Sequence, residues 1–333
     1  MRILIYGAGV IGEKSMKNEE YKKLSIKEFT KAAGRYESSH AGIYEMCKKD
    51  YPDILEELEK EPFRDLLDAG CGPAPMISLL AEKYPEAQIV GNAKTFNMIP
   101  QFFAFDLEGR KVVVKEGDTL SLGSHTLQFV MAPMVHWPEV MVGYEATEKV
   151  LFSADAFGKF GALSADEDWT CEARRYYFNI VGKYGAPVQT LLKKAAGLDI
   201  KTICPLHGPV LKDNLNYYIE KYLTWSSYEP EDDGILVACA SIHGNTKTAA
   251  LKMVDILKEN GYEKVAFTDL TRDDMAEAVE DAFRYGRLIV AAASYDGGVF
   301  PPMEDFVNRL SHKAYQKRKV GIIENGSWAP TAA

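Results

Sequence analysis

The loop at residues 241–246 holds the first set of residues that could do chemistry. It reads Ser-Ile-His-Gly-Asn-Thr, follows an apolar run and precedes a stretch with helical spacing. Such a loop suits a phosphate, because the hydroxyls of Ser241 and Thr246 can donate hydrogen bonds, Gly244 allows close approach, and the first amides of the helix are unpaired. The loop lacks the Gly-Lys-Ser/Thr ending of nucleoside-triphosphate P-loops. A simple helix cap by Asn245 or Thr246 is the structural alternative.

Alternating strands and helices surround this loop and must position it. Apolar runs predict the strands, and apolar residues at helical spacing predict the helices. The strands are expected at residues 235–240, 264–267, 287–293 and 319–323, and the helices at residues 247–258, 273–283 and 302–310. This β-α-β alternation predicts a doubly wound parallel sheet.

Ligands of doubly wound sheets bind outside the carboxyl ends of the strands. Three loops leave those ends, and two of them carry Tyr295 and Trp328, whose flat rings suit an aromatic ligand. One phosphate loop and two aromatic loops together suit FMN, and in these three loops the chain resembles flavodoxin. The expected FMN contacts are Ser241, Ile242, His243, Gly244, Asn245, Thr246, Ser294, Tyr295, Asp296, Gly297, Gly298, Asn325, Gly326, Ser327 and Trp328.

Composition and charge narrow the class of protein. A hydrophobic content of 47% and a charged content of 26% are ordinary for a soluble globular chain. The formal net charge of −9 argues against nucleic acid or an anionic membrane as the main partner. The five cysteines are scattered, which indicates a reducing compartment. Because no apolar run approaches the ~18 residues of a membrane span, and no leader peptide is evident, we expect a cytoplasmic protein.

The first residues resemble the start of a dinucleotide-binding Rossmann domain. Residues 1–12 read as a strand followed by Gly-x-Gly-x-x-Gly, with glycines at 7, 9 and 12. The motif needs an amphipathic helix after it and an acidic residue after a second strand. Residues 13–23 are polar and charged without an apolar stripe, so NAD binding is not expected.

Residues 14–91 carry a second resemblance, to class I S-adenosylmethionine methyltransferases. Residues 63–72 predict a strand entering a glycine turn, Asp68-x-Gly-x-Gly, and residues 88–90 predict a second strand. In that family an acidic residue at the end of the second strand holds the ribose, whereas this chain has Asn92 near that point. A tight structural turn is therefore favoured, and methyl transfer stays an alternative.

The middle of the chain places three potential metal ligands at strand ends. Strands are expected at residues 111–114, 126–131 and 150–153, and the ligands are His136, Asp155 and His207. Two imidazoles and a carboxylate can converge on a metal of iron or zinc type. A hydrogen-bonded turn residue is the plain alternative for each of them.

These ligands belong to a longer resemblance, to flavodiiron proteins. Residues 92–230 resemble the second half of their metallo-β-lactamase-like domain, notably at residues 168–178 and 214–228, and residues 231–333 resemble their flavodoxin domain. The resemblance implies a homodimeric reductase that passes electrons from FMN to a non-haem di-iron centre and reduces dioxygen or nitric oxide, with an electron-donor protein or reduced cofactor as partner. It implies that His136 and His207 each bind one iron and that Asp155 bridges them.

Two departures from the family shape the expectation. The family's upstream His-x-Glu-x-Asp-His motif is absent, since His40 is the only histidine before residue 92, so an impaired iron site is expected. An FMN electron carrier with a dead metal site is the alternative, and a metal-dependent hydrolase would need its own His-rich motif. The resemblance also stops before the last flavodoxin elements.

The expected fold is α/β throughout. A Rossmann-like starter (1–13) and a methyltransferase-like βαβ fragment (14–91) precede an incomplete αββα metallo-β-lactamase-like domain (92–230). A truncated flavodoxin-like doubly wound parallel sheet (231–333) follows.

Overall fold

The computed structural model describes residues 2–6, 56, 65–69, 80, 83–102, 107–161, 168–326 and 331. The chain divides into two compact units, which interleave along the sequence. The first is Met1–Ala156 with Asp199–Leu206, and the second is Phe157–Leu198 with His207–Ala333. The borders expected at residues 13, 91 and 230 stay predictions. The glycine turns expected at residues 7–12 and 70–72, and the contacts Ser327 and Trp328, lie outside the described residues.

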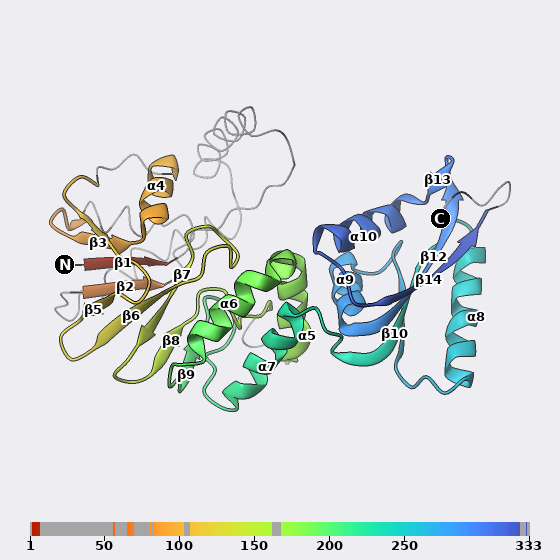
Figure 1. The fold of residues 1–333 in the computed structure, drawn as a ribbon. Coiled ribbons are helices and arrows are strands. Elements are labelled where there is room, and N and C mark those ends of the chain that lie inside the picture. The colour runs from red at the N-terminus through yellow and green to blue at the C-terminus, as the bar shows by residue number, and fades with distance from the viewer. Residues whose placement is uncertain are drawn as a thin grey trace. The chain divides into compact units, whose positions relative to one another are not determined.

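The first unit contains a parallel sheet of four strands. These are β1 (Arg2–Tyr6), β2 (Asp65–Ala69), β3 (Gln88–Gly91) and β4 (Lys111–Val113), in the order β2-β1-β3-β4. The strands expected in the two N-terminal fragments therefore form, and they share one sheet with a strand from beyond residue 92 (Figure 1). Helix α4 (Ala93–Phe102) lies between β3 and β4 in the chain.

A second sheet of five strands completes this unit. Its order is β5-β6-β7-β8-β9, with antiparallel neighbours except for the parallel pair β8 and β9. The strands are β5 (Thr119–Ser121), β6 (Thr126–Met131), β7 (Met141–Glu145), β8 (Val150–Phe152) and β9 (Thr202–Cys204). The chain leaves the unit after β8 and returns at Asp199 to add β9.

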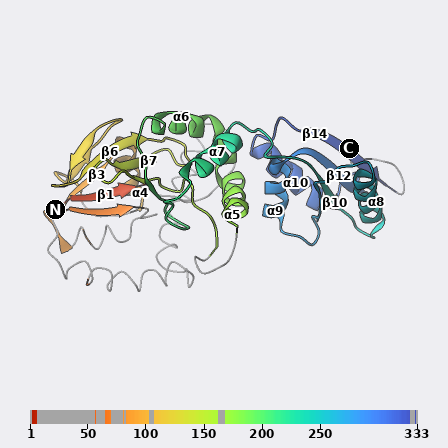
Figure 2. The ribbon, with the colours of Figure 1, turned by 90° about the horizontal axis from the view of Figure 1, so that it is seen from below.

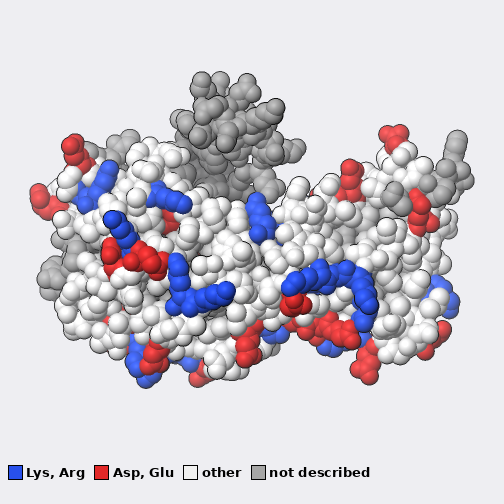
Figure 3. Space-filling model, in the orientation of Figure 1, with Lys and Arg blue, Asp and Glu red and all other residues white. Residues whose placement is uncertain are grey.

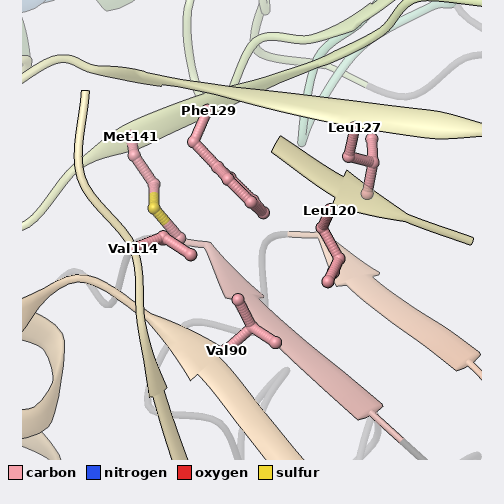
Figure 4. Packing of buried hydrophobic residues seen from close by; sticks show 6 residues of the cluster. All are labelled: Val90, Val114, Leu120, Leu127, Phe129 and Met141. Atoms are coloured by element: carbon pink, nitrogen blue, oxygen red, sulfur yellow. The ribbon is translucent and has the colours of Figure 1, made fainter. Parts of the chain in front are cut away.

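The core of the first unit lies between its two sheets. Figure 4 shows Val90 from β3 pointing toward residues of the second sheet. The other members of the cluster are Val114, Leu120, Leu127, Phe129 and Met141. Leu127 and Phe129 alternate along β6 with less buried residues, as expected of a strand with one face on a core. The burial of these apolar side chains holds the two sheets together.

Asn92 joins α4 to a loop of the second sheet. Its Oδ1 accepts hydrogen bonds from the backbone N–H groups of Lys94 at 2.9 Å and Thr95 at 3.1 Å, which is the arrangement of a helix N-cap. Its Nδ2 donates to the carbonyl of Glu139 at 2.6 Å. The residue at the position of the methyltransferase acid therefore anchors the loop that carries His136.

The second unit begins with helices that enclose an aromatic cluster. The helices are α5 (Trp169–Tyr176), the π-helix η1 (Tyr177–Val181), the short η2 (Gly182–Tyr184), α6 (Gly185–Ala195) and α7 (Leu215–Ser226). The rings of Tyr177 and Tyr222 lie 5.2 Å apart, and the ring of Trp225 lies 5.3 Å from that of Tyr222. Phe178 of η1 stacks at 4.1 Å on Phe283, which belongs to the next part of the unit. These large buried rings fix the helices together.

The rest of the second unit is a doubly wound sheet, as expected. Strand order is β11-β10-β12-β14 with all of these neighbours parallel, and β13 forms a hairpin with β12. The strands are β10 (Asp232–Ala240), β11 (Val265–Asp269), β12 (Tyr285–Tyr295), β13 (Gly298–Val299) and β14 (Lys319–Asn325). Helix α8 (Asn245–Glu259) covers one face, and α9 (Met275–Arg284) and α10 (Pro301–His312) cover the other (Figures 1 and 2).

A buried ionic network fixes α5 to this sheet. Arg174 of α5 donates through Nη1 to Glu231 at 2.9 Å and through Nε to Glu280 of α9. Lys221 at 2.6 Å and the indole N–H of Trp225 at 2.8 Å also donate to Glu231. Burial raises the pKa of Glu231, but Arg174 and Lys221 outweigh burial and hold the pKa below its usual value. Burial raises the pKa of Glu280 to about 7, although Arg174 opposes the shift.

The surface mixes charges of both signs. Figure 3 shows basic and acidic side chains side by side on one face. Among the described residues, no helix is long and apolar enough to cross a membrane.

Candidate functional site

The loops after β10, β12 and β14 meet around one pocket of about 490 Å³. They come together because parallel neighbours present their carboxyl ends at the same edge of the sheet. The pocket is lined by Ser241, Ile242, His243, Asn245, Thr246, Ala293, Ser294, Tyr295, Asp296, Gly297, Asn325, Gly326 and Thr331. Gly244 and Gly298, which were also expected there, do not line it. The roles of these residues as FMN contacts stay predictions.

One end of the pocket is the start of α8. Gly244, with a φ of 89°, holds the cap position, and no side chain caps the helix. The alternative of a simple cap by Asn245 or Thr246 is therefore wrong. The backbone N–H of Gly244 donates to Ser241 Oγ at 3.0 Å, which fixes the turn of the loop. The uncapped amides of a 15-residue helix remain available to an anion.

The opposite wall is a hairpin between β12 and β13. Asp296 and Gly297 form its two-residue turn, with φ values of 49° and 76°. Two successive positive φ values belong to the type I′ turn, for which Asp-Gly is a preferred sequence. The turn places Tyr295 at the pocket with 52% of the residue exposed, its ring 5.7 Å from that of Phe300. An exposed tyrosine ring can stack on a planar ligand.

Two residues of the pocket carried no signal in the sequence. Ala293 is the end of an apolar run, and Thr331 lies beyond the expected loops. The backbone N–H of Thr331 donates to Ser294 Oγ at 3.0 Å, which brings this position to the pocket.

No Lys or Arg occurs among the residues described as lining the pocket. Its titratable side chains are His243, Tyr295 and Asp296. The positive potential for an anion therefore comes from the end of α8 and from neutral hydrogen-bond donors rather than from a fixed cation.

The three potential metal ligands are divided between the two units. His136 and Asp155 belong to the first, where His136 Nε2 lies 3.2 Å from Asp155 Oδ2. His207 belongs to the second, where its Nδ1 lies 3.1 Å from the carbonyl of Lys159. A Cβ added to Gly158 would lie 2.6 Å from the His207 ring, so this histidine packs directly on glycine backbone.

A di-iron centre needs more donors than the structure describes. Within the described ranges, no group of three or more His, Cys, Asp or Glu side chains is placed to hold a metal ion. The described donor set does not fit two irons, since each iron would require its own imidazole and carboxylate ligands. Iron binding by His136, Asp155 and His207 stays a prediction.

Known proteins match both the sequence and the fold. Residues 74–208 match the family model described as ODP family beta lactamase. The uncharacterized protein MJ0732 of Methanocaldococcus jannaschii is 31% identical over 206 residues, covering 59% of this chain and 51% of that protein. The anaerobic nitric oxide reductase flavorubredoxin of Klebsiella pneumoniae is 28% identical over 228 residues, covering 65% and 47%. This chain thus spans about half the length of these curated relatives.

Solved structures decide the fold. The flavodiiron protein from Giardia intestinalis superposes with a TM-score of 0.77 at 21% identity, covering 85% of this chain and 73% of its own. The rubredoxin oxygen:oxidoreductase from Desulfovibrio gigas gives 0.70 at 24% identity, covering 77% and 66%. The fold is that of the flavodiiron proteins. The family match on the sequence includes His136, Asp155 and His207, and it begins at residue 74, inside the segment with the methyltransferase-like turn.

Proposed function

We propose that this chain binds FMN and acts as an oxidoreductase of the flavodiiron type, with dioxygen or nitric oxide as substrate. The observation that carries the proposal is the pocket at the carboxyl ends of β10, β12 and β14. The names of two similar proteins, a nitric oxide reductase flavorubredoxin and a rubredoxin oxygen:oxidoreductase, support both the reaction type and an electron-donor protein as partner. A homodimer is proposed on the resemblance.

The lining of the pocket supports FMN as its ligand, because hydrogen-bond donors lie at one end and an exposed aromatic ring at the other. The phosphate would bind the loop at residues 241–246, where α8 supplies uncapped amides and Thr246 a hydroxyl. The isoalloxazine ring would stack on Tyr295 and, by expectation, on Trp328. When bound, FMN supplies electron and hydride transfer. The chain's own part is to hold the phosphate, orient the ring and shield its faces.

We propose that the iron site is impaired, with an FMN electron carrier as the second candidate function. The missing upstream His-x-Glu-x-Asp-His motif supports the second candidate, because in the family that motif supplies further iron ligands.

The first experiment is a visible absorption spectrum of the purified chain after incubation with FMN and removal of the excess. Retained flavin with a perturbed spectrum supports the proposal, and loss of all flavin refutes it. Iron analysis of the same sample then separates the two candidates. Two irons per chain would refute the electron carrier, whereas flavin without stoichiometric iron would support it. Tight binding of S-adenosylmethionine would instead favour the methyltransferase alternative.

A further inference from the structure

Because the described lining of the pocket holds no Lys or Arg, the direction of its neutral donors decides how a phosphate is bound. One of these donors is Thr246, which lies in the first turn of α8 and is only 2% exposed. A hydroxyl group has one hydrogen to donate and lone pairs that accept. The Thr246 hydroxyl can donate a hydrogen bond to a phosphate only if it does not already donate to a protein acceptor.

Thr248, two positions further along α8, shows the competing arrangement. Its Oγ1 donates to the carbonyl of Gly244 at 3.0 Å, four residues earlier. This bond is common for Ser and Thr inside helices, and it uses the hydrogen of the hydroxyl. Thr246 differs, because its Oγ1 accepts a hydrogen bond from Asn325 Nδ2 at 3.0 Å. With a lone pair engaged by Asn325, the hydrogen of the Thr246 hydroxyl is left to donate.

We propose that Asn325 is a positioning residue that makes the pocket selective for the phosphorylated form of flavin. The inference rests on the proposed FMN site. Asn325 is the last residue of β14, 79 positions from Thr246, so the bond ties the third loop of the pocket to the start of α8. It turns the Thr246 hydroxyl into a donor for the phosphate. The isoalloxazine ring, common to FMN and riboflavin, does not depend on it.

The test compares dissociation constants for FMN and riboflavin, measured by quenching of flavin fluorescence. Asn325→Leu removes the amide donor and is expected to weaken FMN about tenfold, the effect of one hydrogen bond to a charged group. Asn325→Asp is expected to weaken FMN by more, because a carboxylate accepts the Thr246 hydrogen and repels the phosphate. Riboflavin affinity is expected to change by less than about twofold in both variants.

The matched control is Asn260→Asp at the other end of the same helix. Asn260 Nδ2 donates to the carbonyl of Ile256 at 2.7 Å, far along α8 from the pocket loop. This variant makes the same change of charge and is expected to keep both dissociation constants at the wild-type value.

A double-mutant cycle tests whether Asn325 acts through Thr246. In a Thr246→Val background, Asn325→Leu is expected to have no further effect on FMN, since there is no hydroxyl to direct. Three outcomes would each overturn the inference while leaving the FMN site intact. Asn325→Leu could weaken the binding of FMN and riboflavin equally, it could leave FMN binding unchanged, or its effect in the cycle could be additive with that of Thr246→Val. If the wild-type chain binds neither flavin, the proposed FMN site is refuted, and so is the inference that rests on it.

Discussion

Replacing Arg174 with Met is expected to be among the most destabilising single changes in the second unit. The Arg174 side chain is 3% exposed and bonds two carboxylates, Glu231 and Glu280, which are themselves largely buried. Its removal leaves both without their strongest partner, and breaking a buried pair in this way costs about 3–5 kcal/mol. The matched control is Arg309→Met, since Arg309 pairs at 3.0 Å with the exposed Asp305 on α10. An exposed pair of this kind contributes about 0.5 kcal/mol.

The assay is urea unfolding followed by circular dichroism, with the variant and the control measured in parallel. The Arg174 variant is expected to lose about 3–5 kcal/mol, a large part of the ~5–15 kcal/mol that is typical of a domain. A loss below about 1 kcal/mol would refute the idea that this network fixes α5 to the sheet.

The same variant has a defined pH dependence. Burial already raises the pKa of Glu280 to about 7, from an ordinary value of 4.5, and Arg174 is the main group that opposes the rise. Without Arg174 the pKa rises further, so the folded state holds the Glu280 proton more tightly than the unfolded state does. The variant therefore gains stability as the pH falls toward 4.5 and loses it as the pH rises through the folded pKa. A stability deficit that is unchanged between acidic and alkaline buffer would contradict this account.

Two further substitutions test other parts of the structure. Gly158→Ala places a Cβ 2.6 Å from the ring of His207 and is expected to lower stability by about 1–3 kcal/mol in a thermal-shift assay. The control in the same assay is Gly197→Ala, whose Cβ would meet nothing nearer than 3.9 Å. A neutral Gly158→Ala would mean that His207 does not pack on this backbone. Asn92→Ala removes the cap of α4 and is expected to lower the urea midpoint by the equivalent of about 1–2 kcal/mol. The exposed Asn97→Ala on the same helix is expected to be neutral, and equal effects of the two would contradict the capping role.

The flavodoxin-like part was the most predictable region of the chain. Its strands are long and apolar, so β10, β12 and β14 were found within a few residues, and α8 within two. Three strand-end loops could be recognised because the order of elements fixes where parallel strands present their carboxyl ends. Other elements carried too little local signal. Strand β9 has only three residues and forms through its parallel pairing with β8, and β7 is buried at every position, so it lacks alternation.

The sequence by itself determined the α/β class, and it located the Ser/Gly/Asn/Thr loop at residues 241–246 and the three potential metal ligands, because these follow from residue type and local periodicity. Tertiary structure decided how the chain interleaves into two units and that Asn92 serves as a cap and anchor. It also decided that Asn325 reaches Thr246 across 79 positions. These features depend on long-range pairing of strands and on the direction of individual side chains. Neither the pairing nor the side-chain direction produces a periodic pattern in the sequence, so these features can be seen only in the folded chain.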